Sequence, residues 1–209
     1  MESGLRQKAG ECGLTAVTLQ SPLGRIRVAG CEDGVHHIQI LTEGAPAERT
    51  AEAPLACVVC EGHEEMTTPV REAADWLLAY FNDPQTMDKY PLPAFHHPLL
   101  QEVTFTSRVL QTLVREVKVG ETVSYKRLAE MAGNSKAVRA VGGAMRRNPV
   151  PLLIPCHRVI SSSGESGSYM GGKGNHLKEW LLTHERLSER PPLSTMQILP
   201  PFCPPAHGM

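Results

Sequence analysis

Cys156 is the residue of this chain most clearly suited to catalysis, because a histidine follows it directly in the segment "PCHRV" (155–159). A thiolate is a strong nucleophile, and a nearby imidazole can take its proton. Adjacent residues on an extended chain point to opposite faces, so a contact through water suits Cys156 and His157 better than a direct one. Glu185, in a later helical pattern, is a candidate to orient His157. A buried structural thiol is the alternative, since free cysteines often pack in apolar runs.

A second kind of chemistry is metal binding, because the first hundred residues contain several cysteines and histidines. Cys57 and Cys60 are the local CxxC pair, but they lie in a poorly patterned stretch without a second pair. Other cysteines and histidines of this half do not form a spaced motif. From the residues alone, a metal site stays open.

Composition limits the class of protein. The chain has 209 residues, of which 41% are hydrophobic, enough for one compact unit or two small ones. Its formal charge of −1 gives no global basicity, but residues 108–147 hold nine Lys or Arg against three Glu. That local excess is either a footprint for phosphates or a solvated face. We find neither a signal peptide nor a membrane span, and therefore expect an intracellular protein with reduced thiols.

The patterning predicts an amino-terminal meander and a helical carboxy-terminal half. Three β-leaning runs separated by turns occupy residues 14–41, and residues 43–69 are typical of a long surface loop. A proline-rich link places a domain boundary near residue 95, giving domains 1–95 and 96–187 and a tail, 188–209, without a packing pattern. The expected helices cover residues 70–83, 104–119, 122–133, 135–148 and 177–185, and an apolar, strand-like run covers 148–160.

The helices expected over 122–133 and 135–148, joined by a tight turn, have the layout of a helix-turn-helix. The second carries three arginines between small residues, "AVRAVGGAMRR". Two adjacent glycines inside a helix cost about 1 kcal/mol each relative to alanine, which favours close approach to DNA or to another helix. An ordinary packed helix pair is the alternative.

Four stretches together carry a resemblance to a known family: "PCHRVI", "SYKRLA", "KAVRAVGGAMRRNPVP" and "GSYMGG" followed by "LKEWLLTHE". Over residues 12–186 the chain resembles the O6-alkylguanine-DNA alkyltransferase family in its vertebrate branch. The resemblance implies an α/β fold of two domains. The first would be a small antiparallel sheet with a helix, ribonuclease H-like, and the second a mostly helical domain with a helix-turn-helix.

The resemblance also implies an activity. Cys156 resembles the acceptor that takes the alkyl group from O6 of guanine irreversibly, so that one molecule repairs one lesion. His157 and Glu185 resemble its relay through water, Tyr125 the tyrosine that helps to protonate the leaving guanine, and Asn148 a hinge.

Family members bind double-stranded DNA that contains O6-alkylguanine, through the minor groove, and flip the base out of the helix. Arg139 resembles the arginine that fills the gap. The other DNA-binding candidates are Tyr125, Thr106, Ser107, Ala137, Ala140, Gly142 and Arg146. The candidates for the guanine pocket are Met145, Val159, Tyr169 and Met170. Met170 stands where vertebrate members often have Ser, so the tolerance for bulky alkyl groups is expected to differ.

The vertebrate branch binds a structural zinc through two Cys and two His. The matching residues are Cys12, Cys31, His36 and His96. His97, the neighbour of His96, is the competing ligand. The resemblance further implies no organic cofactor, no membrane partner, a nuclear location, and a monomer, with cooperative binding on DNA left open.

Two other classes of function compete with this one. A DNA-binding module of similar fold would lack the cysteine, which is present here. A cysteine hydrolase using Cys156 and His157 would need an oxyanion hole, for which we find no motif.

Overall fold

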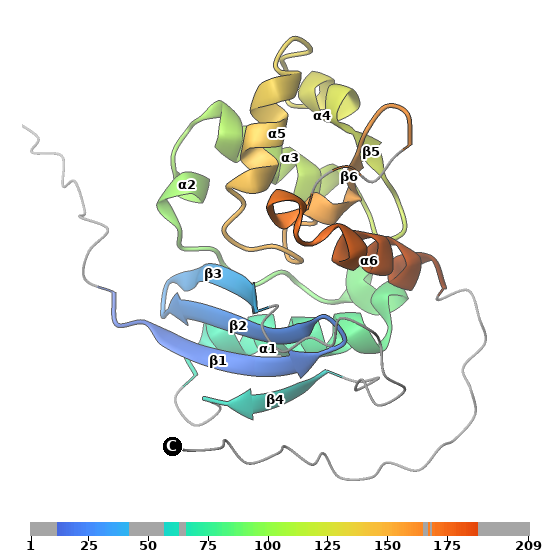
Figure 1. The fold of residues 1–209 in the computed structure, drawn as a ribbon. Coiled ribbons are helices and arrows are strands. Elements are labelled where there is room, and N and C mark those ends of the chain that lie inside the picture. Colours follow the sequence, from blue (N-terminus) through green and yellow to red (C-terminus); the bar gives the residue numbers. More distant parts are fainter. Residues whose placement is uncertain (1–11, 42–56, 63–65, 165–166, 168, 188–209) are drawn as a thin grey trace, which may run out of the picture.

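Four strands and one long helix form the amino-terminal part of the computed structural model, which describes residues 12–41, 57–62, 66–164, 167 and 169–187 (Figure 1). The strands are β1 (Thr15–Ser21), β2 (Gly24–Cys31), β3 (Gly34–Leu41) and β4 (Val58–Glu61). They pair antiparallel in the order β3-β2-β1-β4. The predicted meander is therefore confirmed.

Strand β4 corrects the prediction of a surface loop over residues 43–69. Val58 and Val59 pair with Gln20 and Leu19 of β1, and a register irregularity follows on β1. Two adjacent β-branched residues favour a strand, but four residues are too few to show an alternating pattern in the sequence. Residues 42–56 lie outside the described part of the chain.

Helix α1 (Thr68–Asn82) packs its apolar face against the sheet. Its first turn contains Pro69, whose fixed φ suits the start of a helix, and it ends before Pro84. Val70, Leu77 and Phe81 are among its buried residues, as the spacing predicts.

The carboxy-terminal part is mostly helical. The turn of 3-10 helix η2 (Pro84–Lys89) still belongs to the amino-terminal part. The elements of the carboxy-terminal part are α2 (Pro98–Gln101), α3 (Phe105–Glu116), β5 (Val123–Ser124), α4 (Tyr125–Met131), α5 (Val138–Arg146), η3 (Cys156–Arg158), β6 (Val159–Ile160), η4 (Met170–Gly172) and α6 (Asn175–Leu187). The short strands β5 and β6 pair in parallel. The two-domain fold class is confirmed, whereas the tail from residue 188 lies outside the described residues.

Helices α4 and α5 form the predicted helix-turn-helix (Figure 1). The turn passes through Gly133, whose φ of +85° favours glycine. Helix α5 begins at Val138, three residues later than Ser135, the predicted start. The delay arises because the Asn134 side chain accepts a hydrogen bond from the Lys136 amide and holds a turn there.

The apolar run before Cys156 is a buried loop and not a strand, which corrects the prediction of a strand-like run there. Prolines at 149, 151 and 155 remove backbone donors. The loop closes on itself through the Ile154 amide, which donates to the Val150 carbonyl at 3.0 Å. Leu152, fully buried, has a φ of +77°. Cys156 and His157 consequently lie on one turn of 3-10 helix and not on an extended chain.

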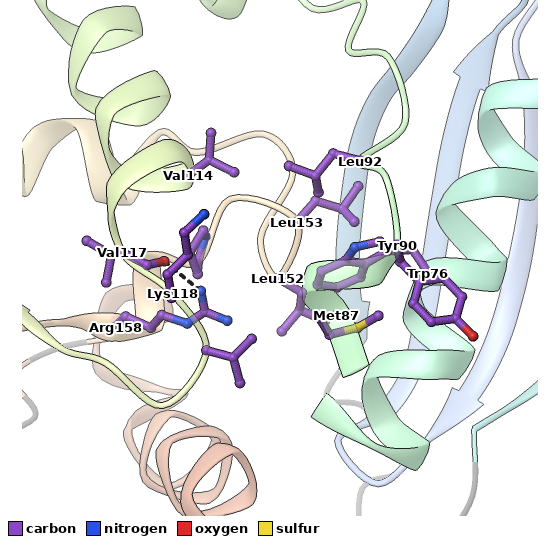
Figure 2. A pocket seen from close by; sticks show the side chains of 12 residues that line it. Trp76, Met87, Tyr90, Leu92, Val114, Val117, Lys118, Leu152, Leu153 and Arg158 are labelled. Atoms are coloured by element: carbon purple, nitrogen blue, oxygen red, sulfur yellow. Dashed lines mark hydrogen bonds between the residues drawn. The ribbon is translucent and has the colours of Figure 1, made fainter. Parts of the chain in front are cut away.

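A cavity of about 200 Å³ lies where the two parts meet. Figure 2 shows Trp76 and Met87 on one side and Val117 and Arg158 on the other. Pro155 and Arg158 line it, but among the described residues Cys156 is not part of its lining. The cavity therefore borders the segment that carries Cys156 without including Cys156 itself.

None of the helices within the described residues is long and apolar enough to span a bilayer.

Candidate active site and metal centre

Cys156 opens the 3-10 turn η3, and only 6% of its surface is exposed. Burial raises the pKa of its thiol, and hydrogen bonds from Asn148 and Tyr169 and the charge of Lys178 partly offset that rise. The thiol is consequently protonated at neutral pH, so a reaction at this sulfur needs a proton acceptor.

His157 is fully buried beside it, and its Nε2 lies 2.7 Å from Oε1 of Glu185. Burial lowers the pKa of His157, although Glu185 opposes the change. Because a carboxylate accepts at Nε2, the hydrogen of the neutral imidazole belongs on Nε2. Nδ1 then carries the free lone pair, and this buried atom has no hydrogen-bond partner among the described residues. The arrangement therefore provides a neutral imidazole whose Nδ1 can accept a proton.

Glu185, also fully buried, is held by an arginine that follows the histidine. Arg158 donates from Nε and Nη2 to the carboxylate at 2.9 Å, and from Nη1 to the Val117 carbonyl. Burial alone would raise the pKa of Glu185, but His157 and Arg158 outweigh it and hold the pKa well below its usual range. The carboxylate is therefore charged throughout the neutral range.

Three residues of this site were missed by sequence reasoning: Arg158, Tyr80 and Lys178. The Tyr80 hydroxyl donates to Glu185 Oε1 at 2.8 Å, and Lys178 Nζ, fully buried, donates to the Val159 carbonyl at 2.7 Å. An arginine inside an apolar run could have indicated a buried ion pair. Tyr80 had no such signal, because it lies 105 residues from its partner.

The residues predicted for a guanine pocket differ in their exposure. Tyr169 and Val159 are buried, and burial followed by the charge on Cys156 raises the pKa of Tyr169. The Tyr169 hydroxyl has no hydrogen-bond partner of ordinary geometry in the described part of the chain, although its interaction with Cys156 affects both groups. Met145 is half-buried. Met170 lies at the surface, 42% exposed, with a φ of +50°.

Tyr125 and Asn148 connect this pocket to the helix-turn-helix. Tyr125 begins helix α4 and is half-buried, and burial followed by the proximity of Cys156 raises the pKa of its hydroxyl. Asn148 follows helix α5, where its Nδ2 donates to the Ile154 carbonyl at 2.8 Å and its Oδ1 accepts from the Val150 amide. Asn148 thereby ties the end of helix α5 to the loop before Cys156.

Most residues predicted to bind DNA are at the surface. Arg139, Ala140 and Arg146 are exposed, and the partly exposed members are Ala137, Gly142 and Thr106. Ser107 differs from the others: it is buried, and its hydroxyl donates to the Leu100 carbonyl, so its side chain faces the core. A DNA contact of Ser107 stays a prediction.

The four predicted metal ligands come together. Nδ1 of His96 lies 3.2 Å from both Cys31 Sγ and His36 Nε2, and 3.7 Å from Cys12 Sγ. All four donor atoms lie within 4.8 Å of one another. A tetrahedral ion with bonds of about 2.0–2.3 Å has ligand atoms about 3.3–3.8 Å apart. The three distances from His96 agree with this range to within about 0.1 Å, whereas a pair as far apart as 4.8 Å would have to move closer.

Local structure explains why His96 and not His97 joins this cluster. The segment of His96 pairs with β3, where its amide donates to the Val35 carbonyl at 2.9 Å. His97 points elsewhere, and its Nδ1 accepts from the Leu99 amide at the start of helix α2. The competing ligand is thus used as a helix cap.

Replacing Glu185 by Gln is expected to lower the free energy of unfolding by about 3 kcal/mol at pH 7, because Arg158 would remain buried without an anion. Urea unfolding measures the change. Since the folded pKa of Glu185 is depressed, its stabilisation is present above its usual pKa of 4.5 and is lost as the pH falls. The difference between the two chains should therefore shrink below pH 4.5.

The matched control is Glu61→Gln, which removes an exposed carboxylate 2.7 Å from Arg25. A surface pair contributes at most about 1 kcal/mol, so this variant should unfold almost as the unaltered chain does. Equal effects of the two substitutions would contradict the role assigned to the buried carboxylate.

Comparison with known proteins places this geometry in a family. Residues 14–94 match the model of the 6-O-methylguanine DNA methyltransferase ribonuclease-like domain, and residues 104–187 match the DNA binding domain of the same family. The methylated-DNA–protein-cysteine methyltransferase of Homo sapiens is 49% identical over 84% of this chain and 82% of its own length. The protein of that name from Rattus norvegicus is 50% identical over 88% and 87%.

Solved structures agree with this assignment. The O6-methylguanine methyltransferase of Mycobacterium tuberculosis superimposes with a TM-score of 0.60 at 28% identity, over 87% of this chain and 96% of that one. A relative from Methanosarcina barkeri, at 35% identity, is more distant in sequence than the mammalian proteins. The chain belongs to the 6-O-methylguanine DNA methyltransferase family, in its vertebrate branch.

Proposed function

We propose that this chain repairs double-stranded DNA by transferring the alkyl group from O6 of guanine to Sγ of Cys156, one group per molecule. The supporting observation is a buried thiol beside the His157–Glu185 pair, in a domain that also carries an exposed, arginine-bearing helix. The mammalian relatives are named methylated-DNA–protein-cysteine methyltransferases, and a Mycobacterium tuberculosis relative was solved in complex with DNA.

The proposed reaction is an in-line displacement. The thiol proton passes through one water to Nδ1 of His157, while Glu185 stabilises the charge on the imidazole. The new sulfur–carbon bond forms as the bond between carbon and O6 breaks, and its electron pair remains on the guanine. The Tyr125 hydroxyl, whose pKa is raised by burial, stays protonated and can donate to that leaving group.

The reaction ends after one transfer for a chemical reason. A thioether carbon is a poor target for a second nucleophile, because an uncharged dialkyl sulfide releases its thiolate only very slowly at neutral pH. The protein offers no second thiol at this place among its described residues, since the other free cysteines described lie in the amino-terminal part.

Incubation with duplex DNA carrying O6-[methyl-³H]guanine is expected to label each protein molecule with one methyl group, because the product thioether is stable. Cys156→Ser should abolish the label, and Cys60→Ser, in strand β4, should leave it unchanged. Counting tritium per mole of protein measures this. Many methyl groups per molecule would indicate a hydrolase, and binding without transfer would indicate a DNA-binding module; either would overturn the proposal.

We also propose that the chain flips the alkylated guanine into the pocket beside Cys156. The support is that Cys156 is buried and therefore cannot reach a base stacked in a duplex. Arg139, exposed on helix α5, is the residue proposed to occupy the gap, with Ala140 and Gly142 allowing close contact with the minor groove.

Arg139→Ala is therefore expected to slow transfer from duplex DNA by about tenfold, roughly 1.4 kcal/mol, because the unstacked state loses a stabilising group. Its reaction with the free base O6-benzylguanine should be unchanged. Single-turnover kinetics with both substrates test this. The matched control is Arg127→Ala, on helix α4, where the guanidinium pairs with Glu130. Slowing with the free base as well would refute the assignment.

We propose that Zn²⁺ is the ion held by Cys12, Cys31, His36 and His96. Two thiolates and two imidazoles are the donor set that zinc prefers, and four protein ligands leave no position open for chemistry, so its role would be structural. The site would join strands β2 and β3 to the segment around His96.

Metal analysis of the purified chain is expected to find one zinc per molecule. Cys31→Ser and His96→Ala should each reduce the zinc content and the melting temperature, because the tetrahedral set is broken. His97→Ala, which removes the helix cap beside the cluster, should keep the zinc. Undiminished zinc in both ligand variants would refute the site.

We propose a nuclear location on the basis of the substrate alone, since the DNA to be repaired lies there. Immunofluorescence of the untagged chain would contradict this if it found the protein only outside the nucleus.

A further inference from the structure

Tyr80 is a buried tyrosine whose hydroxyl reaches the proton relay from the other domain. It lies on helix α1 of the amino-terminal part, is fully buried, and donates to Glu185 Oε1 at 2.8 Å. The same oxygen lies 2.7 Å from His157 Nε2. One carboxylate oxygen thus accepts hydrogen bonds from both Tyr80 and His157, the histidine of the proposed reaction.

The ring of Tyr80 is held rigidly. It stacks on Trp76 with centroids 5.3 Å apart and planes at 10°, and it meets Phe81 and His184 edge to face. Its backbone carbonyl lies 3.0 Å from His184 Nε2 on helix α6. Packing on several sides aims the hydroxyl at Glu185, so little side-chain entropy is lost in making this contact.

The hydroxyl is not needed to keep the carboxylate charged. Arg158 already makes a two-point contact with Glu185, and the Gly120 amide donates to Oε2 at 3.2 Å. A phenylalanine at position 80 would preserve the volume and the stacking. Arg158 Nη2 also donates to Oε1, the oxygen that faces His157. What the tyrosine adds is a further donor on that oxygen from the amino-terminal domain, which holds the carboxylate from a second direction.

We propose that Tyr80 is a positioning residue for alkyl transfer: its hydroxyl fixes Glu185 Oε1 and thereby holds the His157 ring with Nε2 on the carboxylate and Nδ1 free to accept a proton. The inference rests on the proposed function of Cys156. The amino-terminal domain contributes in this way to a relay whose reacting atoms all belong to the carboxy-terminal domain.

The charged and titratable groups around the carboxylate determine the direction of the pH effect. They are Arg158 and His157 on η3 and Tyr80 on α1, with Lys178 of α6 acting on His157. Without the Tyr80 hydroxyl, Oε1 interacts more strongly with His157 and favours the imidazolium. The pKa of His157 then rises, and its Nδ1 accepts a proton from the thiol only at higher pH.

The test is Tyr80→Phe in the full chain, with single-turnover transfer from duplex DNA carrying O6-methylguanine over a range of protein concentrations and pH. The transfer step should slow by about tenfold, part of what a well-placed general base contributes. The DNA dissociation constant should not change, and the acid limb of the rate profile should move to higher pH. Reaction with free O6-benzylguanine should slow by the same factor.

The matched control is Ser21→Ala, which removes another buried, hydrogen-bonded hydroxyl of the amino-terminal domain. Urea unfolding of both variants shows how much stability each has lost. An unchanged rate and pH profile in Tyr80→Phe, or slowing equal to that of Ser21→Ala, would overturn the inference. Failure of the unaltered chain to transfer any methyl group would instead refute the proposed function, so the two results are distinguishable.

Discussion

The buried carboxylate of Glu185 is the constraint on which the rest of this structure depends. A charge removed from water must be met by donors on every side, and here they come from three separate segments. Arg158 and His157 belong to η3, Tyr80 to helix α1, and Gly120 to the loop after helix α3. Satisfying one anion therefore fixes how helix α6, the segment of Cys156 and the amino-terminal domain meet. Because the same anion orients His157, the contacts that pack the two domains together also hold the proton acceptor in place.

The sulfur itself is prepared differently. Burial keeps Cys156 protonated, while Asn148, Tyr169 and Lys178 stabilise the thiolate only in part. A permanently ionised thiolate would react with any electrophile that reached it, and a thiol in an apolar core would not react at all. The arrangement lies between these limits, because the acceptor, Nδ1 of His157, is buried with its lone pair free. In the proposed reaction, selectivity would come from which alkyl groups can align with the sulfur and the proton acceptor, and not from the intrinsic reactivity of the thiol.

How much could be predicted from the sequence depended on how local each signal was. The meander, helix α1 and the helix-turn-helix follow from turns, caps and periodicity within about fifteen residues. The residues themselves indicated Cys156, His157 and Glu185 as candidates, whereas the family resemblance supplied their roles and the four metal ligands, which periodicity could not pair across the chain. Strand β4 was missed because four residues carry no pattern. The loop before Cys156 looked like a strand, since apolar character alone does not distinguish a buried loop from a buried strand. The burial of Ser107 depends on which face of helix α3 packs on the core, and the contact of Tyr80 depends on how the two domains meet. No local pattern contains either kind of information.

Strand β3 lies at one edge of the sheet, and its outer side is already occupied (Figure 1). The Val35 amide donates to the Ala94 carbonyl, the His96 amide donates to the Val35 carbonyl, and the Ile38 amide donates to the carbonyl of Pro149. An uncovered edge strand is a template on which a second chain can add a strand of its own and begin to aggregate. The segments that carry His96 and Asn148 thus have a protective effect besides their chemical roles. Loosening either of them would expose a β-edge, so opening the metal centre or the domain junction would also offer a place for a second chain to pair.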